Sequence, residues 1–168
     1  MSLGMMRDIG AWITAYLARI PETITAAAGN DGAEVDGPWI NVTGALGEGI
    51  EGHGAVVALC WSATLADTET LTVGPMNLQD ATDISGTGAA DFGPTTAAAV
   101  VATADGAQTL NGVTFHKVKE FNGNRGYVRL QSTVDLSATG TDTVDVAAIL
   151  ILGGSANLPK SPGVHSLT

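Results

Sequence analysis

The chain is poor in the residues on which metal sites and disulfide-stapled folds depend. Its 168 residues include one cysteine, Cys60, and three histidines, His53, His116 and His165. No spacing such as His-Glu-x-x-His or Cys-x-x-Cys occurs. We therefore expect no metal, no cofactor and no internal disulfide. Cys60 is expected to be a small buried hydrophobe, and the three histidines are expected to face solvent.

Positive charge is scarce as well. Seven lysines and arginines stand against seventeen acidic residues, which gives a formal net charge of −10. The basic residues are scattered, and acid outnumbers base everywhere except over residues 116–130. Because nucleic-acid binding requires a basic stripe that neutralises phosphates, we exclude a nucleic-acid partner.

Long apolar runs are absent. No stretch approaches the roughly 20 apolar residues that a transmembrane helix needs, so we expect no membrane partner. Residues 1–28 do not have the pattern of a secretion signal, because their apolar residues are spaced and Arg7 is followed by Asp8.

Catalytic motifs are missing too. Ser155 follows two glycines after an expected strand, but the chain continues as Ala-Asn-Leu-Pro and not as the helix of a nucleophile elbow. Asp80, Asp83 and Asp91 share a segment rich in Gly, Thr and Ala, where aspartate is ordinary turn chemistry. The sequence therefore predicts a protein without enzymatic activity.

One acidic loop leaves a calcium site open. Asn30, Asp31, Glu34 and Asp36 offer oxygen ligands within one turn-forming segment, although the spacing of an EF-hand is absent. A solvated acidic turn is the simpler interpretation, and calcium binding stays an alternative.

Large apolar residues near the N-terminus recur at helical spacing. Asp8 lies near the start of this stripe, Arg19 near its end, and Pro21 stops it. The pattern predicts an amphipathic helix over residues 6–19, which either packs on its own domain or forms an arm that packs on a neighbouring subunit. The stripe consists of Ile9, Trp12, Ile13, Tyr16, Leu17 and Ile20.

The rest of the chain alternates apolar and polar residues between turns rich in Gly, Thr, Asp and Asn. The alternation predicts about seven strands and a mainly β fold, an antiparallel β-sandwich of the jelly-roll type. We expect the last strand to be covered on both sides in its second half, since both of its faces become apolar there. The clearest strands are expected at 55–65, 126–136 and 143–152, with shorter ones near 71–73, 96–103 and 113–115. The expected organisation is a helical arm over 1–28, a β-sandwich domain over 29–153 and an extended tail over 154–168.

Several short segments resemble a loose class of small virion proteins of tailed bacteriophages. The resemblance lies in Arg125-Gly-Tyr-Val-Arg129 before an apolar strand and Asn157-Leu-Pro159, in Met6-Arg-Asp-Ile9 with Gly32-Ala-Glu-Val-Asp36, and in Ala58-Leu-Cys-Trp61 with Gly88-Ala-Ala-Asp-Phe-Gly93. In such proteins the module decorates or completes the head, often as a jelly-roll trimer or as the base of a fibre. The N-terminal segment is longer here than in that class.

The resemblance implies a non-enzymatic capsid decoration or cement protein, localised to a virion that is assembled in the host cytoplasm. Its partners would be capsid or other virion proteins and further copies of itself, as a homo-oligomer and in particular a trimer. Two alternatives stay open: a head–tail, tail or head-spike-base component, and a carbohydrate-binding β-sandwich module. The residues expected to form the assembly interface are Ile9, Trp12, Ile13, Tyr16 and Leu17.

Overall fold

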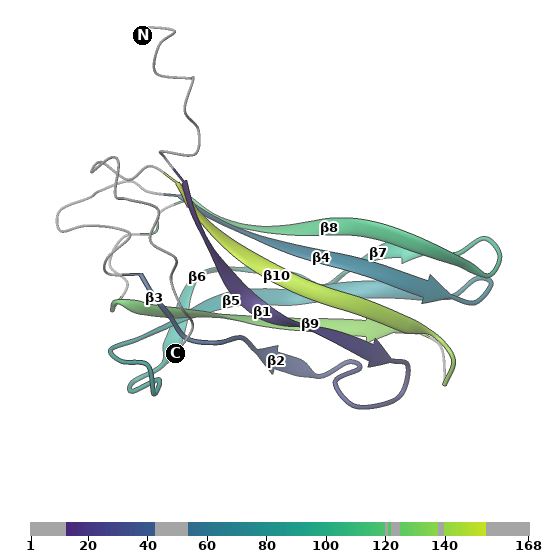
Figure 1. Ribbon diagram of the computed structural model, residues 1–168, viewed down its shortest axis with the longest axis horizontal. Helices are drawn as coiled ribbons and strands as arrows, with labels where there is room; N and C mark the ends of the chain where they lie inside the picture. Colours follow the sequence, from purple (N-terminus) through teal and green to yellow (C-terminus); the bar gives the residue numbers. More distant parts are fainter. Residues whose placement is uncertain (1–12, 43–53, 120, 122–124, 138–139, 154–168) are drawn as a thin grey trace, which may run out of the picture.

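The computed structural model of the chain describes residues 13–42, 54–119, 121, 125–137 and 140–153. Within these ranges every regular element is a β-strand, and two antiparallel sheets pack as a sandwich (Figure 1). The predicted antiparallel β-sandwich is confirmed. The described residues contain no helix with the length and apolar character needed to cross a bilayer.

The sheet nearer the viewer in Figure 1 has four strands in the order β1-β10-β4-β8. The register is unbroken from β10 to β4 and from β4 to β8, whereas β1 shifts twice against β10, on either side of Arg19. These strands are β1 (Ile13–Thr25), β10 (Thr143–Gly153), β4 (Ala55–Leu65) and β8 (Gln108–Val118).

The second sheet has six strands, of which β9 and β5 form the centre. Two short strands, β2 and β3, both pair with β9, and another two, β6 and β7, both pair with β5. The bounds are β2 (Glu34–Asp36), β3 (Ile40–Asn41), β5 (Thr70–Ala81), β6 (Ala90–Thr96), β7 (Ala99–Thr103) and β9 (Tyr127–Leu136).

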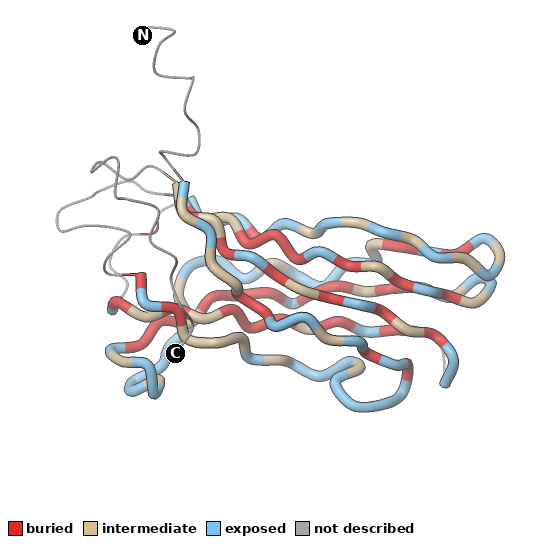
Figure 2. Tube along the Cα trace, viewed as in Figure 1, coloured by how far each residue is buried: buried red, intermediate tan, exposed pale blue. Residues whose placement is uncertain are grey.

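The core lies between the two sheets and is built by alternation along each strand. Figure 2 shows this as buried positions that alternate with exposed or intermediate ones along the long strands. The inward residues expected from the sequence are buried in β4, β9 and β10, because every second side chain of a strand points to the same face. They include Val57, Leu59, Leu65, Val128, Leu130, Val134, Val144, Leu150 and Leu152.

The predicted N-terminal helix is wrong for residues 13–19, which form the first half of strand β1. This segment pairs with β10, and the isoleucines and threonines of the whole of β1 suit a pleated strand. Pro21 does not end the element, because β1 is an edge strand and one row of its backbone groups needs no partner. The rest of the predicted helix, 6–12, and the predicted tail, 154–168, lie outside the described residues.

The edge formed by β1 is tied to the second sheet by a buried arginine. Ala18 and Arg19 are neighbours in sequence, yet both are buried, because the two register shifts turn both side chains inward. Arg19 Nη1 donates to the Oγ and carbonyl oxygen of Ser132 on β9, at 2.8 and 3.2 Å, and Nη2 donates to Glu22 at 2.7 Å. The backbone also approaches closely here, since a Cβ on Gly37 would overlap the carbonyl oxygen of Ala18. This side of the sandwich is therefore closed.

Candidate functional site

The outer face of the four-stranded sheet is apolar toward one end. Residues directly opposite each other in a sheet share a face, and Ile149 lies between Leu17 and Ala58, with Phe115 beyond Ala58. The neighbouring rows are similar in character. We call this set the outer apolar face, and its members are Ala15, Leu17, Val56, Ala58, Cys60, Val113, Phe115, Ala147, Ile149 and Ile151.

Large side chains of the outer apolar face remain exposed. Phe115 is 54% exposed, Val113 48% and Ile149 39%. The expectation that the second half of the last strand is covered on both sides is thus not met by the described residues. A contiguous apolar patch on the outside of a folded domain marks an interaction surface, because leaving it in water costs free energy.

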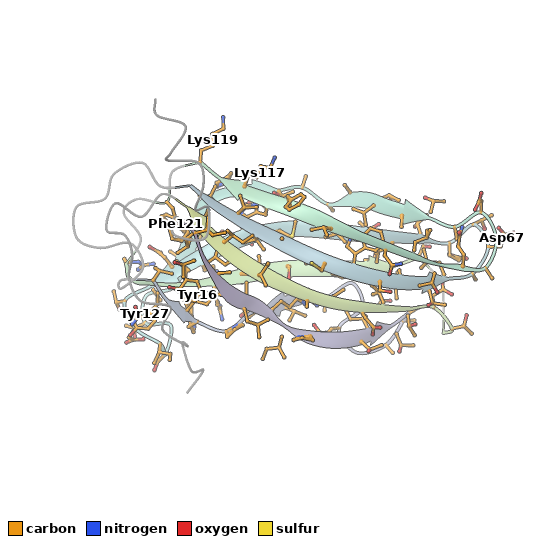
Figure 3. All side chains as sticks on the ribbon, turned by 45° about the horizontal axis from the view of Figure 1, so that its top comes forward. Tyr16, Asp67, Lys117, Lys119, Phe121 and Tyr127 are labelled. Atoms are coloured by element: carbon orange, nitrogen blue, oxygen red, sulfur yellow. The ribbon has the colours of Figure 1, made fainter. Side chains whose placement is uncertain are left out.

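Polar groups border the outer apolar face. Toward the far end of the sheet a row of threonines crosses all four strands, at Thr25, Thr143, Thr64 and Thr109. At the near end Lys117 lies opposite Val56, and Lys119 follows it. Figure 3 shows both lysines at the end of the sandwich that also holds Tyr16, Phe121 and Tyr127, far from Asp67. The outer apolar face is therefore bordered by polar residues at both ends of the sheet.

The interface residues expected from the sequence do not share one stripe. Ile13 and Leu17 lie on the outer side of β1, with Ile13 45% exposed, whereas Tyr16 lies opposite Leu150 and packs against the core. Burial accordingly raises the pKa of the Tyr16 hydroxyl. Ile9 and Trp12 lie outside the described residues. Sequence reasoning missed Val113, Phe115 and Ile149 as surface residues. For Ile149 there was a signal, because both faces of the last strand become apolar in its second half.

A hollow of about 810 Å³ runs beside the edge of β8 that faces away from β4, which we call the open edge. The walls come from both sheets, so the hollow lies where the two sheets part. Trp61 reaches it from β4, because Gly112 on β8 leaves room for the indole ring. The lining residues are Trp61, Pro94, Thr96, Val101, Asn111, Gly112, Val113, Thr114, Phe115 and Lys117.

The outer face of the six-stranded sheet is polar, in contrast. Arg129 pairs with Asp36 at 2.7 Å, donates to Gln79 and stacks on Trp39 at 4.7 Å from the ring centroid. A chain of amide contacts crosses four strands beside it, from Glu34 through Gln131 and Asn77 to Asp91. These groups satisfy one another, so this face is held together by its own hydrogen bonds.

The three aspartates considered for catalysis do not converge. Asp80 is buried at the end of β5 and pairs with Arg125 at 2.6 Å, and this contact raises the pKa of the Arg125 guanidinium. Asp83 accepts hydrogen bonds from the backbone of Ser85 and Thr87, and hydrogen bonds from Thr87 are the main cause that lowers its pKa. Asp91 joins the polar network instead. Each aspartate has its own structural partner.

The acidic loop considered for calcium is similarly occupied. Asp31 accepts hydrogen bonds from the backbone of Ala27 and Leu136, at 2.6 and 2.8 Å, and Asn30 donates to Glu22. Among the described residues no three side chains of His, Cys, Asp or Glu come together as a metal site would require. The expectations of no metal and no cofactor remain predictions.

Two single residues differ from expectation. His116 is fully buried and not solvated, with Nδ1 2.7 Å from Thr96 Oγ1 and no partner at Nε2, and burial lowers its pKa. Cys60 is exposed on the outer apolar face and is not a buried hydrophobe. His53 and His165 lie outside the described residues.

The aromatic grouping considered for carbohydrate binding does not form an exposed platform. Phe121 is buried and meets Phe92 edge to face, with ring centroids 5.4 Å apart. Tyr127 is half-buried and accepts a hydrogen bond from Asn41. Together with the burial of His116, this leaves no shared flat surface among these residues.

No protein-family model matches the chain, and no curated protein matches it significantly in sequence. The resemblance to phage virion proteins therefore rests on the short segments quoted above.

Proposed function

We propose that the chain is a non-enzymatic structural protein of a tailed-bacteriophage particle, bound to the capsid as a decoration or cement protein. The outer apolar face is the observation that supports this proposal, because a protein that works by contact needs an uncovered apolar surface. Among the described residues Asp80 pairs with Arg125 and Asp36 with Arg129, and no three side chains of His, Cys, Asp or Glu come together as a metal site would require.

We also infer that the sandwich is a jelly roll. β2 and β3 pair with the same strand and count as one interrupted strand, and β6 and β7 likewise. Eight strands then remain, four in each sheet, in the orders β1-β10-β4-β8 and β2/β3-β9-β5-β6/β7. Each sheet thus places strands from both ends of the chain side by side, as two nested Greek keys require. Capsid and lectin domains both use this architecture.

The energy of such a contact suits an assembly with many copies. Six of the larger side chains on the outer apolar face are still partly exposed, namely Leu17, Val56, Val113, Phe115, Ile149 and Ile151. Covering each would contribute about 1 kcal/mol, or roughly 6 kcal/mol gross. One contact of this strength is weak once the cost of association is included. Repeated by the symmetry of a shell, together with contacts between copies, it would hold the protein in place.

Charge favours a position on the outside of the shell. A chain with a net charge of −10 is repelled by packaged nucleic acid, whereas acidic charge toward solvent keeps a particle soluble.

The test is binding to shells that lack this protein. The natural chain should bind at hundreds of copies per particle, and an Ile149→Glu, Phe115→Glu variant should lose most of that binding, because the two charges would be buried against the shell. Ile84→Glu is the matched control, since Ile84 is 60% exposed on a loop away from this face. Equal binding of both variants would refute the proposal. A count of about a dozen copies or fewer would favour the alternative of a head–tail, tail or head-spike-base component.

A carbohydrate-binding module is the alternative from a different class. It would use the polar outer face of the six-stranded sheet, where Gln79, Asp91 and Arg129 could exchange their mutual hydrogen bonds for those of a sugar. A glycan array decides between the two: reproducible binding that is lost in a Gln79→Ala, Arg129→Ala variant would replace the structural proposal.

A further inference from the structure

Edge strands expose unpaired backbone groups, and most edges in this protein are blunted. β1 has two register shifts and carries Pro21 and Glu22, while β2 and β3 are very short and the first contains two acids. β6 and β7 are short as well, and β6 contains Pro94. Such features are those by which natural proteins keep sheet edges from pairing with other chains.

β8 lacks these protections. It runs for 11 residues in unbroken register with β4, contains neither proline nor an acidic residue, and carries one charge, Lys117, near its end. In the described part of the chain β4 is the one strand that pairs with β8, so the open edge offers backbone donors and acceptors. Natural edges are rarely this long, regular and uncharged unless another strand pairs with them.

The hollow beside β8 supports the addition of a strand. The indole of Trp61 and the side chain of Val101 border this hollow, and an added strand would lie along it and cover them. On the other side of the sandwich, Arg19 and the close approach at Gly37 join the described strands of the two sheets. Among the described strands, the edge of β8 is therefore where the two sheets part.

β8 is complementary to a second copy of itself. β8 runs from Gln108 to Val118, so Val113 is its middle residue. Two antiparallel copies that pair along their full length are therefore centred on Val113. In this register Val113 faces its own copy, Phe115 faces Asn111, and Lys117 faces Thr109, so no like charges meet. The strand also avoids the repulsion that other contacts between copies of this acidic chain would suffer, because it is free of acid.

We propose that two copies of this chain pair antiparallel through β8, centred on Val113, to form one continuous eight-stranded sheet. The two outer apolar faces then lie on the same side of that sheet and form one larger surface. A contact between identical edges generates a two-fold axis, so it gives a dimer and not the trimer expected from the sequence resemblance. The pairing needs no shell, so it stands or falls independently of the proposed function.

Disulfide trapping in the isolated protein tests both the partner and the register. In a Cys60→Ser background, Val113→Cys should give disulfide-linked dimers under mild oxidation, because facing residues lie about 5 Å apart. Thr109→Cys is the matched control on the same face of the same strand. Its two copies would lie about 26 Å apart, eight residues along the pair, so it should not link to itself. Mixed with Lys117→Cys, however, it should form the heterodimer.

Absence of the Val113→Cys dimer, or equal self-linking by Thr109→Cys, would overturn the proposal. Val113→Lys should weaken self-association in sedimentation by about tenfold or more, because two lysines would face each other. Ile20→Lys, on the exposed side of β1, should not weaken it. The opposite ranking would assign the contact to β1.

Discussion

Trp61 and Gly112 lie directly opposite each other on β4 and β8, and the indole ring occupies the space that a Cβ at position 112 would need. The ring passes across the edge strand and donates from Nε1 to Thr114 Oγ1 at 3.3 Å. The indole of Trp61 can therefore form one wall of the hollow beside the open edge because Gly112 has no Cβ.

Gly112→Ala should therefore destabilise the fold by about 2 kcal/mol, because the added carbon forces the indole or the strand to move. Urea unfolding followed by tryptophan fluorescence measures the change as a shift of the midpoint. Gly54→Ala is the matched control, since a Cβ there makes ordinary contacts with the backbone of Val118. A similar loss in both variants would mean that the Trp61 contact is not the cause.

Substitution of Arg19 should also reduce the unfolding free energy strongly. Arg19→Met removes the buried donor that joins β1 to Ser132 on β9 and leaves Glu22 without its cation, so we expect a loss of about 2–3 kcal/mol. The loss stays below the cost of breaking a fully buried pair because Glu22 is 26% exposed. Lys119→Met, at an exposed position, should change the unfolding free energy little. Equal effects of the two substitutions in urea unfolding would contradict this role for Arg19.

Burial of His116 should make stability depend on pH. Its pKa in the folded state is lowered from 6.5 by desolvation, so the unfolded chain takes up the proton first as the pH falls. The contribution is therefore fully present above about pH 6.5 and is lost progressively below it. Unfolding free energies at pH 7.5 and 5.5 should differ more in the natural chain than in His116→Gln. An equal difference in the two proteins would assign the effect to other groups.

The carboxylate of Glu22 affects the unfolding free energy in a different pH range. Hydrogen bonds from Asn30 and Arg19 and the charge of Arg19 outweigh burial and lower the pKa of Glu22 below 4.5. Its contribution is therefore present above about pH 4.5 and is lost only in stronger acid, so it does not obscure the change near pH 6.

The sequence was informative where the strands are regular and in the middle of a sheet. Residues 55–65 and 126–136 alternate cleanly because one face of each meets the core, and the structure confirms both faces. The first strand was misassigned for a physical reason. Its two register shifts place Ala18 and Arg19 both inward and break the period of two, while the spacing of Ile13, Tyr16, Leu17 and Ile20 also fits a helix.

The candidate surface was harder to predict because it reverses the usual relation between polarity and burial. On β8, Phe115 faces outward and His116 faces the core, so alternation identified the strand but the expectation that His116 faces solvent was wrong. The same assumption hid Cys60, whose neighbours Leu59 and Trp61 point inward while Cys60 itself points outward. A single sequence gives the period of a strand, but the partner sheet decides which face is covered.

Cys60 provides a direct reporter of whether the outer apolar face is covered in an assembly. In the isolated chain its exposed thiol should react readily with a colourless aromatic disulfide reagent, and pairing through β8 leaves it accessible. On shells the rate should fall by roughly tenfold or more, because reaction requires access to the thiolate. The matched control is Thr64→Cys in a Cys60→Ser background, an exposed position four residues along the same face in the row of threonines. If the thiol at position 64 remains reactive while Cys60 is protected, the contact is confined to the apolar part of the sheet. Equal rates for Cys60 in the free and shell-bound protein would mean that the shell is held by another surface.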